Sequence, residues 1–319
     1  MTDNGFTKNT NLILIVRYCF LGGVLFFGHF PLILASNSTS LDFLRIVPSV
    51  RGYGLAGNSI ALSGAESSGM NPAGIGQMEK SWDVYTTFYH PVEGANYSHL
   101  AIVKQFSPRG LAMSAGVTHY TIDGGENRDG QQNILGGNSV NQDLALTLGV
   151  AGKAKKSWGW GANFRAARSE LAGYKSNWSL GGDLGVLGRV RGIQLGAYAK
   201  NMGTGIKFIS ETDPLPTEVS LEAGVPFKMV LPLVGYHRDI HRKENALSLG
   251  AEGAFGPFRV RGGYRFDSSE TGSSAAENLY FGVGGNLAGF TLDYGLSQQA
   301  NENDYLHRIG ISAAWGNPE

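Results

Sequence analysis

After residue 80, apolar and polar residues alternate along the chain in segments that are separated by connections rich in glycine and asparagine. Alternation with a period of two places successive side chains on opposite faces of a β-strand. In residues 142–151, Leu144, Leu146 and Leu148 alternate with polar or small residues. In residues 257–266, aromatic and aliphatic side chains occupy one face and three arginines the other. The pattern therefore predicts a series of β-strands.

These strands are expected to be long. Each runs for about 9–11 residues, which is the length that a tilted strand needs to cross a membrane, whereas strands of soluble proteins typically have about 5–6. The predicted strands cover residues 82–91, 96–106, 110–119, 142–151, 157–167, 178–188, 191–200, 217–227, 228–236, 244–255, 257–266, 277–287, 289–297 and 306–315. The fold class is therefore all-β, a transmembrane antiparallel β-barrel of about 14 strands, an even number as in bacterial single-chain barrels.

The connections between the predicted strands alternate in length. Short turns are expected at 107–109, 151–156, 188–190, near Pro226, at Gly256-Pro257 and at Leu287-Ala288, and longer polar loops at 120–141, 168–177, 201–216, 237–243, 267–276 and 298–305. Outer-membrane barrels have short periplasmic turns and longer external loops, whereas a soluble sandwich has no reason to sort its loops in this way. The loop at 120–141 is expected to be the longest.

Composition agrees with a barrel. Of 319 residues 47 are glycine, and 16% are charged, against about a quarter in soluble domains. The chain has one long apolar run, at its N-terminus, whereas a bundle of membrane helices needs several runs of about 20 residues. Net charge is zero, with 26 basic and 26 acidic side chains and no basic tract. No nucleic-acid partner is therefore expected.

Residues 1–36 are predicted to be a signal peptide. Lys8 and Arg17 supply positive charge, residues 18–35 are mostly apolar, and Ser36 begins a run of small polar residues suited to cleavage. An uncleaved membrane anchor is the alternative, because the segment lies at the length boundary between the two. The single cysteine, Cys19, excludes an intramolecular disulfide and would leave with the signal peptide.

Residues 37–80 precede the barrel, which is assigned to residues 81–319. They alternate poorly and are dominated by Gly, Ala and Ser, with a turn signal at Asn71-Pro72. Small side chains let a backbone pack closely against a wall. This segment is therefore predicted to cross the lumen as an N-terminal hatch or plug, with a hatch motif that consists of Asn71, Pro72, Ala73 and Gly74.

A family resemblance rests on three stretches. Residues 43–77 contain a small-residue run with Gly54, Ala56, Ala61 and Gly64, followed by Asn71 to Gly74. Residues 207–227 place Pro-Leu-Pro before a strand, and residues 290–316 form an aspartate-tyrosine strand, a polar loop and His-Arg-Ile. Together they resemble the PorV/PorQ family of outer-membrane β-barrels. Met70 stands where that family often has an aromatic residue, and Glu66-Ser67-Ser68 replaces its usual acidic pair.

The PorV/PorQ family is related to the long-chain fatty acid transporters (FadL-like), fourteen-stranded barrels whose hatch contains an Asn-Pro-Ala motif. The resemblance implies one of two roles. The leading one is uptake of hydrophobic compounds, such as long-chain fatty acids, through a plugged barrel. The alternative is a non-enzymatic part of a type IX-like secretion system that binds protein cargo. A structural, porin-like barrel is a third possibility.

Several charged residues are predicted to face the lumen, because an arginine facing lipid at mid-depth would cost about 2–4 kcal/mol. They hold the wall and plug together by charge pairing, or they bind the polar head of a ligand; both interpretations remain open. The six residues are Asp183, Glu222, Glu252, Arg259, Arg261 and Arg265. The aromatic residues expected to face outward, either as membrane girdles or as ordinary strand side chains, are Trp158, Trp160, Trp178 and Tyr264.

Other candidate chemistry is weaker. Glycine-rich stretches such as residues 52–57 do not lie between a parallel strand and a helix, as a dinucleotide loop requires. His237, Asp239 and His241 lie in a connection without a helical pattern, which is a poor metal site. No nucleophile motif is present, so no cofactor, metal or enzymatic activity is expected. The expected location is the outer membrane, with outer-membrane lipid, a hydrophobic small molecule or secretion-system proteins as partners.

Overall fold

The computed structural model describes residues 39–317, except for 108–110, 129–133, 156, 172, 209–210, 269–277 and 299–304. The predicted signal peptide with Cys19, and residues 37–38 of the predicted hatch, lie outside the described residues.

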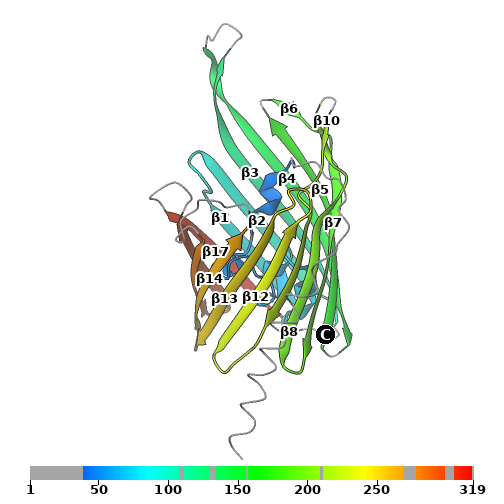
Figure 1. Ribbon diagram of the computed structural model, residues 1–319, viewed down its shortest axis with the longest axis vertical. Coiled ribbons are helices and arrows are strands. Elements are labelled where there is room, and N and C mark those ends of the chain that lie inside the picture. The colour runs from blue at the N-terminus through cyan, green and yellow to red at the C-terminus, as the bar shows by residue number, and fades with distance from the viewer. Residues whose placement is uncertain are drawn as a thin grey trace, which may run out of the picture. The chain divides into compact units, whose positions relative to one another are not determined.

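Fourteen of the described strands form one antiparallel wall (Figure 1). Each strand pairs with its neighbours along the chain, and β1 pairs with β17 from Trp82 opposite Trp315 to Phe88 opposite Ile309, which closes the barrel. The wall consists of β1 (Trp82–Tyr89), β2 (Ala95–Gln105), β3 (Ala112–Arg128), β4 (Ile134–Lys155), β5 (Trp158–Leu171), β7 (Ser179–Val190), β8 (Ile193–Gly203), β11 (Glu218–Gly224), β12 (Val230–Asp239), β13 (Asn245–Phe255), β14 (Phe258–Asp267), β15 (Leu279–Leu287), β16 (Phe290–Gln298) and β17 (Tyr305–Trp315). The predicted all-β barrel of about fourteen strands is confirmed.

Three short strands lie outside this wall. β6 (Tyr174–Lys175) pairs with the end of β5, and β9 (Ile206–Phe208) pairs with β10 (Glu211–Asp213) in a separate hairpin. The predicted loop at 201–216 thus contains short strands of its own.

The predicted loop at 120–141 is wrong for most of its length. β3 continues to Arg128 and β4 begins at Ile134, so the two strands form a hairpin that extends beyond the neighbouring strands (Figure 1). The polar composition that indicated a loop is also compatible with a strand outside the membrane, because paired backbone groups satisfy each other whatever the side chains are. The ladder has register shifts between Asp123 and Arg128, as an irregular extension would.

The connections define two ends of the barrel. One end of the barrel carries the shorter connections, and we call it the short-turn end. Its connections are 106–111, 156–157, 191–192, 225–229, 256–257 and 288–289. The opposite end, which we call the long-connection end, carries the β3–β4 hairpin and the connections 204–217 and 268–278. The predicted alternation of shorter and longer connections is largely present.

The outer face of the wall is apolar. Leu148 is 63% exposed, and Phe281 and Ile309 are each 51% exposed, while their sequence neighbours face inward. A soluble domain rarely exposes a contiguous apolar surface of this extent, whereas a membrane barrel presents one to lipid. Trp158, Trp160 and Trp178 are exposed as the alternation predicted, and they lie near the two ends.

Residues 39–81, which we call the N-terminal segment, lie against the inner face of the wall. They contain four short helices: η1 (Asp42–Arg45), α2 (Val50–Gly54), η2 (Gly64–Ser67) and η3 (Pro72–Gln77). Among the described residues, no helix has the length and apolarity needed to span a membrane. Side chains such as Leu55, Ala73 and Ile75 are fully buried between this segment and the strands. The core therefore lies inside the barrel.

Candidate functional site in the lumen

The Asn-Pro turn of the N-terminal segment is held by its own side chain. Asn71 precedes η3, and its Oδ1 accepts a hydrogen bond from the Ala73 backbone N at 3.0 Å. Pro72 occupies the first helical position, where a missing N–H costs nothing. The Asn71 side-chain amide donates to the carbonyl oxygens of Val186 and Ala197 at 3.3 and 3.5 Å. The turn is thus attached to the wall at β7 and β8.

Two wall glycines make room for this turn. A Cβ added to Gly161 would collide with the Pro72 carbonyl group, and one added to Gly185 would collide with the Asn71 side chain. The four residues Asn71 to Gly74 are all buried. The close approach of two backbones explains why glycines stand at these wall positions.

A network of charged side chains joins the N-terminal segment to β13, β14 and β16. Arg51 donates two hydrogen bonds to the Glu252 carboxylate, at 2.7 and 2.6 Å. Glu252 also accepts from Arg261 at 2.8 Å, and Arg261 donates to Asp293 at 2.5 Å. Arg259 lies at the edge, 3.6 Å from Glu252 with 40% of its side chain exposed. Because each buried charge has a partner, the arrangement avoids the cost of an isolated buried ion.

A second network surrounds Asp183 on β7. Its carboxylate accepts from Arg165 at 2.7 and 3.2 Å, from Asn163 at 2.9 Å and from the Asn201 backbone N at 2.8 Å. Asn163 also donates to the Ser68 carbonyl oxygen at 2.8 Å, which connects the network to the N-terminal segment. The β7–β8 ladder is shifted here, and Asn201 has a φ of 57°, in the left-handed region that Asn tolerates. This bulge turns Lys200 and Asn201 both into the interior.

The remaining predicted charges lie apart from these networks. Glu222 accepts hydrogen bonds from the backbone N and the hydroxyl of Ser59, at 2.9 and 2.8 Å. Arg265 pairs with Asp267 at 3.0 Å, towards the long-connection end. The structure therefore brings Glu252, Arg259 and Arg261 together, whereas Asp183, Glu222 and Arg265 have separate partners.

Sequence reasoning missed several members of the networks. Arg165 and Asp293 stand at inward positions of alternating strands, so the same face argument would have found them. Arg51 lies in a segment without periodicity, and Asn201 reaches the lumen only through the bulge. No sequence pattern indicated these two.

Glu66 in the N-terminal segment is a buried acid. It accepts hydrogen bonds from the Ser49 hydroxyl at 2.7 Å and from the Arg51 backbone N at 3.4 Å. Burial, and then the nearby Asp293 carboxylate, raise the pKa of Glu66 to about 7. The charge on the N-terminal segment therefore depends on pH near neutrality.

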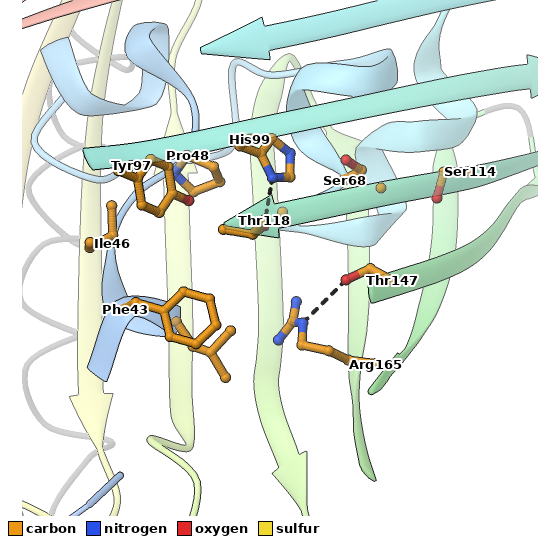
Figure 2. Close-up of a pocket in the computed structure, with 13 residues that line it drawn as sticks. Phe43, Ile46, Pro48, Ser68, Tyr97, His99, Ser114, Thr118, Thr147 and Arg165 are labelled. Atoms are coloured by element: carbon orange, nitrogen blue, oxygen red, sulfur yellow. Dashed lines mark hydrogen bonds between the residues drawn. The ribbon is translucent and has the colours of Figure 1, made fainter. Parts of the chain in front are cut away.

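A small pocket at the long-connection end combines apolar and polar walls. Figure 2 shows Phe43, Ile46, Pro48 and Tyr97 on one side, and Thr147 and Arg165 on the other. His99 Nδ1 lies 2.8 Å from the Thr118 hydroxyl, and Arg165 donates to the Thr147 hydroxyl at 3.3 Å. The pocket measures only about 20 Å³, which is space for about one water.

Two larger cavities lie on either side of the N-terminal segment. One, of about 300 Å³, contains many charged side chains at the long-connection end, among them Arg45, Lys200 and Glu218. The other, of about 500 Å³, lies at the short-turn end and is lined by Ile60, Leu187 and other residues. The two cavities share no lining residue, and residues of the N-terminal segment contribute to both. The segment therefore separates them.

His237, one of the two histidines considered for a metal site, has other partners. His237 Nε2 lies 2.9 Å from the Ser248 hydroxyl and its Nδ1 lies 3.4 Å from the Tyr198 hydroxyl. Within the part of the chain that the structure describes, no group of three or more His, Cys, Asp or Glu side chains is arranged to hold a metal ion.

Comparison with known proteins supports the fold. The chain matches no protein-family model, and no curated protein matches it, so the PorV/PorQ resemblance gains no support from these comparisons. Among solved structures, the toluene transporter TodX of Pseudomonas putida is similar, with a TM-score of 0.60, 12% identity, and coverage of 84% of this chain and 99% of that chain. A Pseudomonas aeruginosa FadL homologue has a TM-score of 0.54, 10% identity and coverage of 84% and 98%. At these identities the likeness concerns the fold.

Proposed function

We propose that this chain is an integral outer-membrane channel for hydrophobic small molecules, in which the N-terminal segment acts as a movable hatch. The observation that carries the proposal is the position of this segment: it lies inside a membrane-type barrel and separates two cavities that face opposite ends. The solved barrels of similar fold are named as a toluene transporter and a FadL homologue, which favours a hydrophobic cargo.

The entry region has suitable chemistry. Leu41, Phe43, Ile206 and Leu215 form a buried apolar cluster at the long-connection end, and Phe43 stacks on Tyr120 with ring centroids 6.5 Å apart. The pocket of Figure 2 continues this apolar surface toward the Asp183 network. An apolar molecule gains free energy by leaving water for such a surface, at about 25 cal/mol per Å² of apolar area.

The same pocket is too small for any hydrophobic ligand, because it holds about one water. Residues 43–48 must therefore move before a ligand enters. Besides its apolar contacts, the segment is attached by hydrogen bonds and ion pairs, such as those of Arg51 and Ser59. Such contacts are directional and can be broken and remade when the segment shifts, and the proposal involves no catalytic step.

The substrate class within this proposal is long-chain fatty acids, with monoaromatic hydrocarbons as the second compounds to test. A role in a secretion system, which the sequence resemblance left open, is not favoured by any contact in the lumen. We therefore do not propose it.

A disulfide that locks the N-terminal segment tests the proposal. Val50 Cγ1 lies 3.2 Å from the position of a Cβ added to Gly295 on β16, which brings the two positions close enough for a Val50→Cys, Gly295→Cys pair to form a disulfide. The pair is made in a Cys19→Ser background. We expect oxidation to abolish uptake of labelled fatty acid by cells, and reduction to restore it.

The matched control is a cross-link within the wall. Val84 and Ile102 are directly opposite each other on β1 and β2, and a disulfide there leaves the N-terminal segment free. It should leave uptake unchanged. If the locked variant transports at the wild-type rate with its cross-link verified, the segment does not gate passage and the proposal is wrong.

A further inference from the structure

The short-turn end of the barrel carries a group of basic side chains, which we call the basic collar. All are exposed except Lys104, which is half-buried. None of them forms an ion pair with a residue that the structure describes. The collar consists of Lys80, Lys104, Arg191 and Lys228.

The acidic residues of this end do not neutralise the collar. Glu79 is exposed at this end. The other two acids face the N-terminal segment: the Asp83 carboxylate accepts a hydrogen bond from the Ala65 backbone N at 2.9 Å, and the Glu222 carboxylate accepts one from the Ser59 hydroxyl. At the long-connection end several bases are paired with acids: Arg242 with Asp42 at 2.5 Å, Lys175 with Glu170 at 3.7 Å and Arg265 with Asp267 at 3.0 Å.

Exposed aromatic and apolar side chains surround the barrel at the level of the collar. Trp82 stacks on Trp315 with ring centroids 6.3 Å apart. The exposed fractions are 58% for Phe227, 63% for Phe258 and 60% for Phe290. Aromatic residues at strand ends mark the boundary between hydrocarbon and head groups, so the collar lies at the depth of lipid phosphates.

Two cations are placed directly on this aromatic belt. Lys104 Nζ lies 4.7 Å from the centre of the Trp82 ring, and Lys228 Nζ lies 5.6 Å from that of Phe227. Lys104 belongs to the outward face of β2, together with the exposed Leu100 and Ile102. A cation on a lipid-facing ring, at the water boundary, is positioned to meet a phosphate from the lipid side.

We propose that the basic collar binds the head groups of anionic phospholipids in the leaflet that faces the short turns. The distribution of the cations favours lipid over a protein partner. They occur beside β1, on β2, at the β7–β8 turn and at the β11–β12 turn, so they are spread along the wall, whereas a protein would dock on one local patch. The apolar outer surface continues directly into the collar, as a lipid-binding surface requires.

The test uses the whole mature barrel, purified in detergent and offered equal amounts of phosphatidylglycerol and phosphatidylcholine with identical acyl chains. Native mass spectrometry measures the ratio of the two lipids retained. We expect the wild type to retain phosphatidylglycerol preferentially and to lose this preference in high salt. In the triple variant Lys104→Gln, Arg191→Gln, Lys228→Gln, the ratio of retained phosphatidylglycerol to phosphatidylcholine should fall by at least about fivefold. A fivefold change is about what the attraction of a single basic side chain to an anionic membrane surface contributes.

The control removes three exposed cations from the other end: Lys175→Gln, Lys207→Gln, Lys243→Gln. It should retain the wild-type lipid ratio. The proposal is overturned if the wild type has no preference, if the collar variant keeps it, or if the control loses it equally. All six positions are at the surface, and the shift in gel migration on boiling verifies that each variant is folded. The result does not depend on which compound the channel carries.

Discussion

Replacing Arg51 by Met tests whether the Glu252 network holds the N-terminal segment in the lumen. Arg51 makes both of its short hydrogen bonds to Glu252, and 18% of its side chain is exposed, against 7% for Glu252. Removing one partner of a buried ion pair costs about 3–5 kcal/mol when the other charge is left alone. Here Glu252 keeps Arg261 at 2.8 Å, so we expect about 2–3 kcal/mol.

That loss corresponds to roughly a 30- to 150-fold larger population of the undocked segment. The assay is the rate of maleimide labelling of a cysteine at position 75, in a Cys19→Ser background. Ile75 is fully buried between the N-terminal segment and the wall, so Ile75→Cys should react when the segment opens. Labelling should accelerate by the same factor while the barrel stays folded, as the shift in gel migration on boiling reports.

Arg259→Met is the matched control. Arg259 approaches the same carboxylate at 3.6 Å, but 40% of its side chain is exposed and it belongs to the wall. An exposed ion pair contributes about 0–1 kcal/mol, so labelling should change less than about fivefold. Equal labelling rates in Arg51→Met and Arg259→Met would refute the idea that the network docks the segment.

Three further predictions concern the hatch and the wall. Asn71→Ala removes the cap on Ala73 at a cost of about 1 kcal/mol; uptake should fall while folded barrel levels stay normal, and normal uptake would contradict the role of this turn. Because the pKa of docked Glu66 is raised to about 7 above the ordinary value near 4.3, the docked segment binds a proton more tightly than the undocked one. Docking should therefore weaken as pH rises from about 4.3 to 7, by up to tenfold per pH unit; Glu66→Gln should abolish this slope in the labelling assay after correction for thiol ionisation, and a slope that persists would assign it to another group. Leu148→Arg places a charge on the outer face, where Leu148 is 63% exposed; it should destabilise the barrel by about 2–4 kcal/mol in urea unfolding from vesicles, and a smaller cost than Leu148→Ala would mean that this face does not contact lipid.

The alternation of side chains determined most of the wall. All fourteen predicted strands correspond to observed ones. Arg261 is inside the barrel, because a strand with one apolar face places that face against lipid and its polar face toward the lumen. The method failed at 120–141, where both faces of the hairpin are polar. Apolar and polar residues alternate only where the two faces of a strand lie in different environments. A strand with water on both faces has no such difference, so its sequence shows no alternation.

The N-terminal segment shows the opposite limit. Its small residues and its Asn-Pro turn predicted close packing inside the barrel, and local chemistry explains the cap of Asn71 on Ala73. The partners came only from the fold. Gly161 and Gly185 lie about 90 or more positions along the sequence from the turn that they accommodate, and Arg51 is separated from Glu252 by 201 positions.

The sequence by itself thus determined the class of fold and the order of the strands in the wall. Only the tertiary structure decided which buried charges meet, that the bulge at Asn201 turns two neighbouring side chains inward, and that the segment separates two cavities. The physical reason is that alternation is a local property of a strand. Pairing of charges across a lumen depends instead on register, curvature and closure, which arise only when all the strands are assembled.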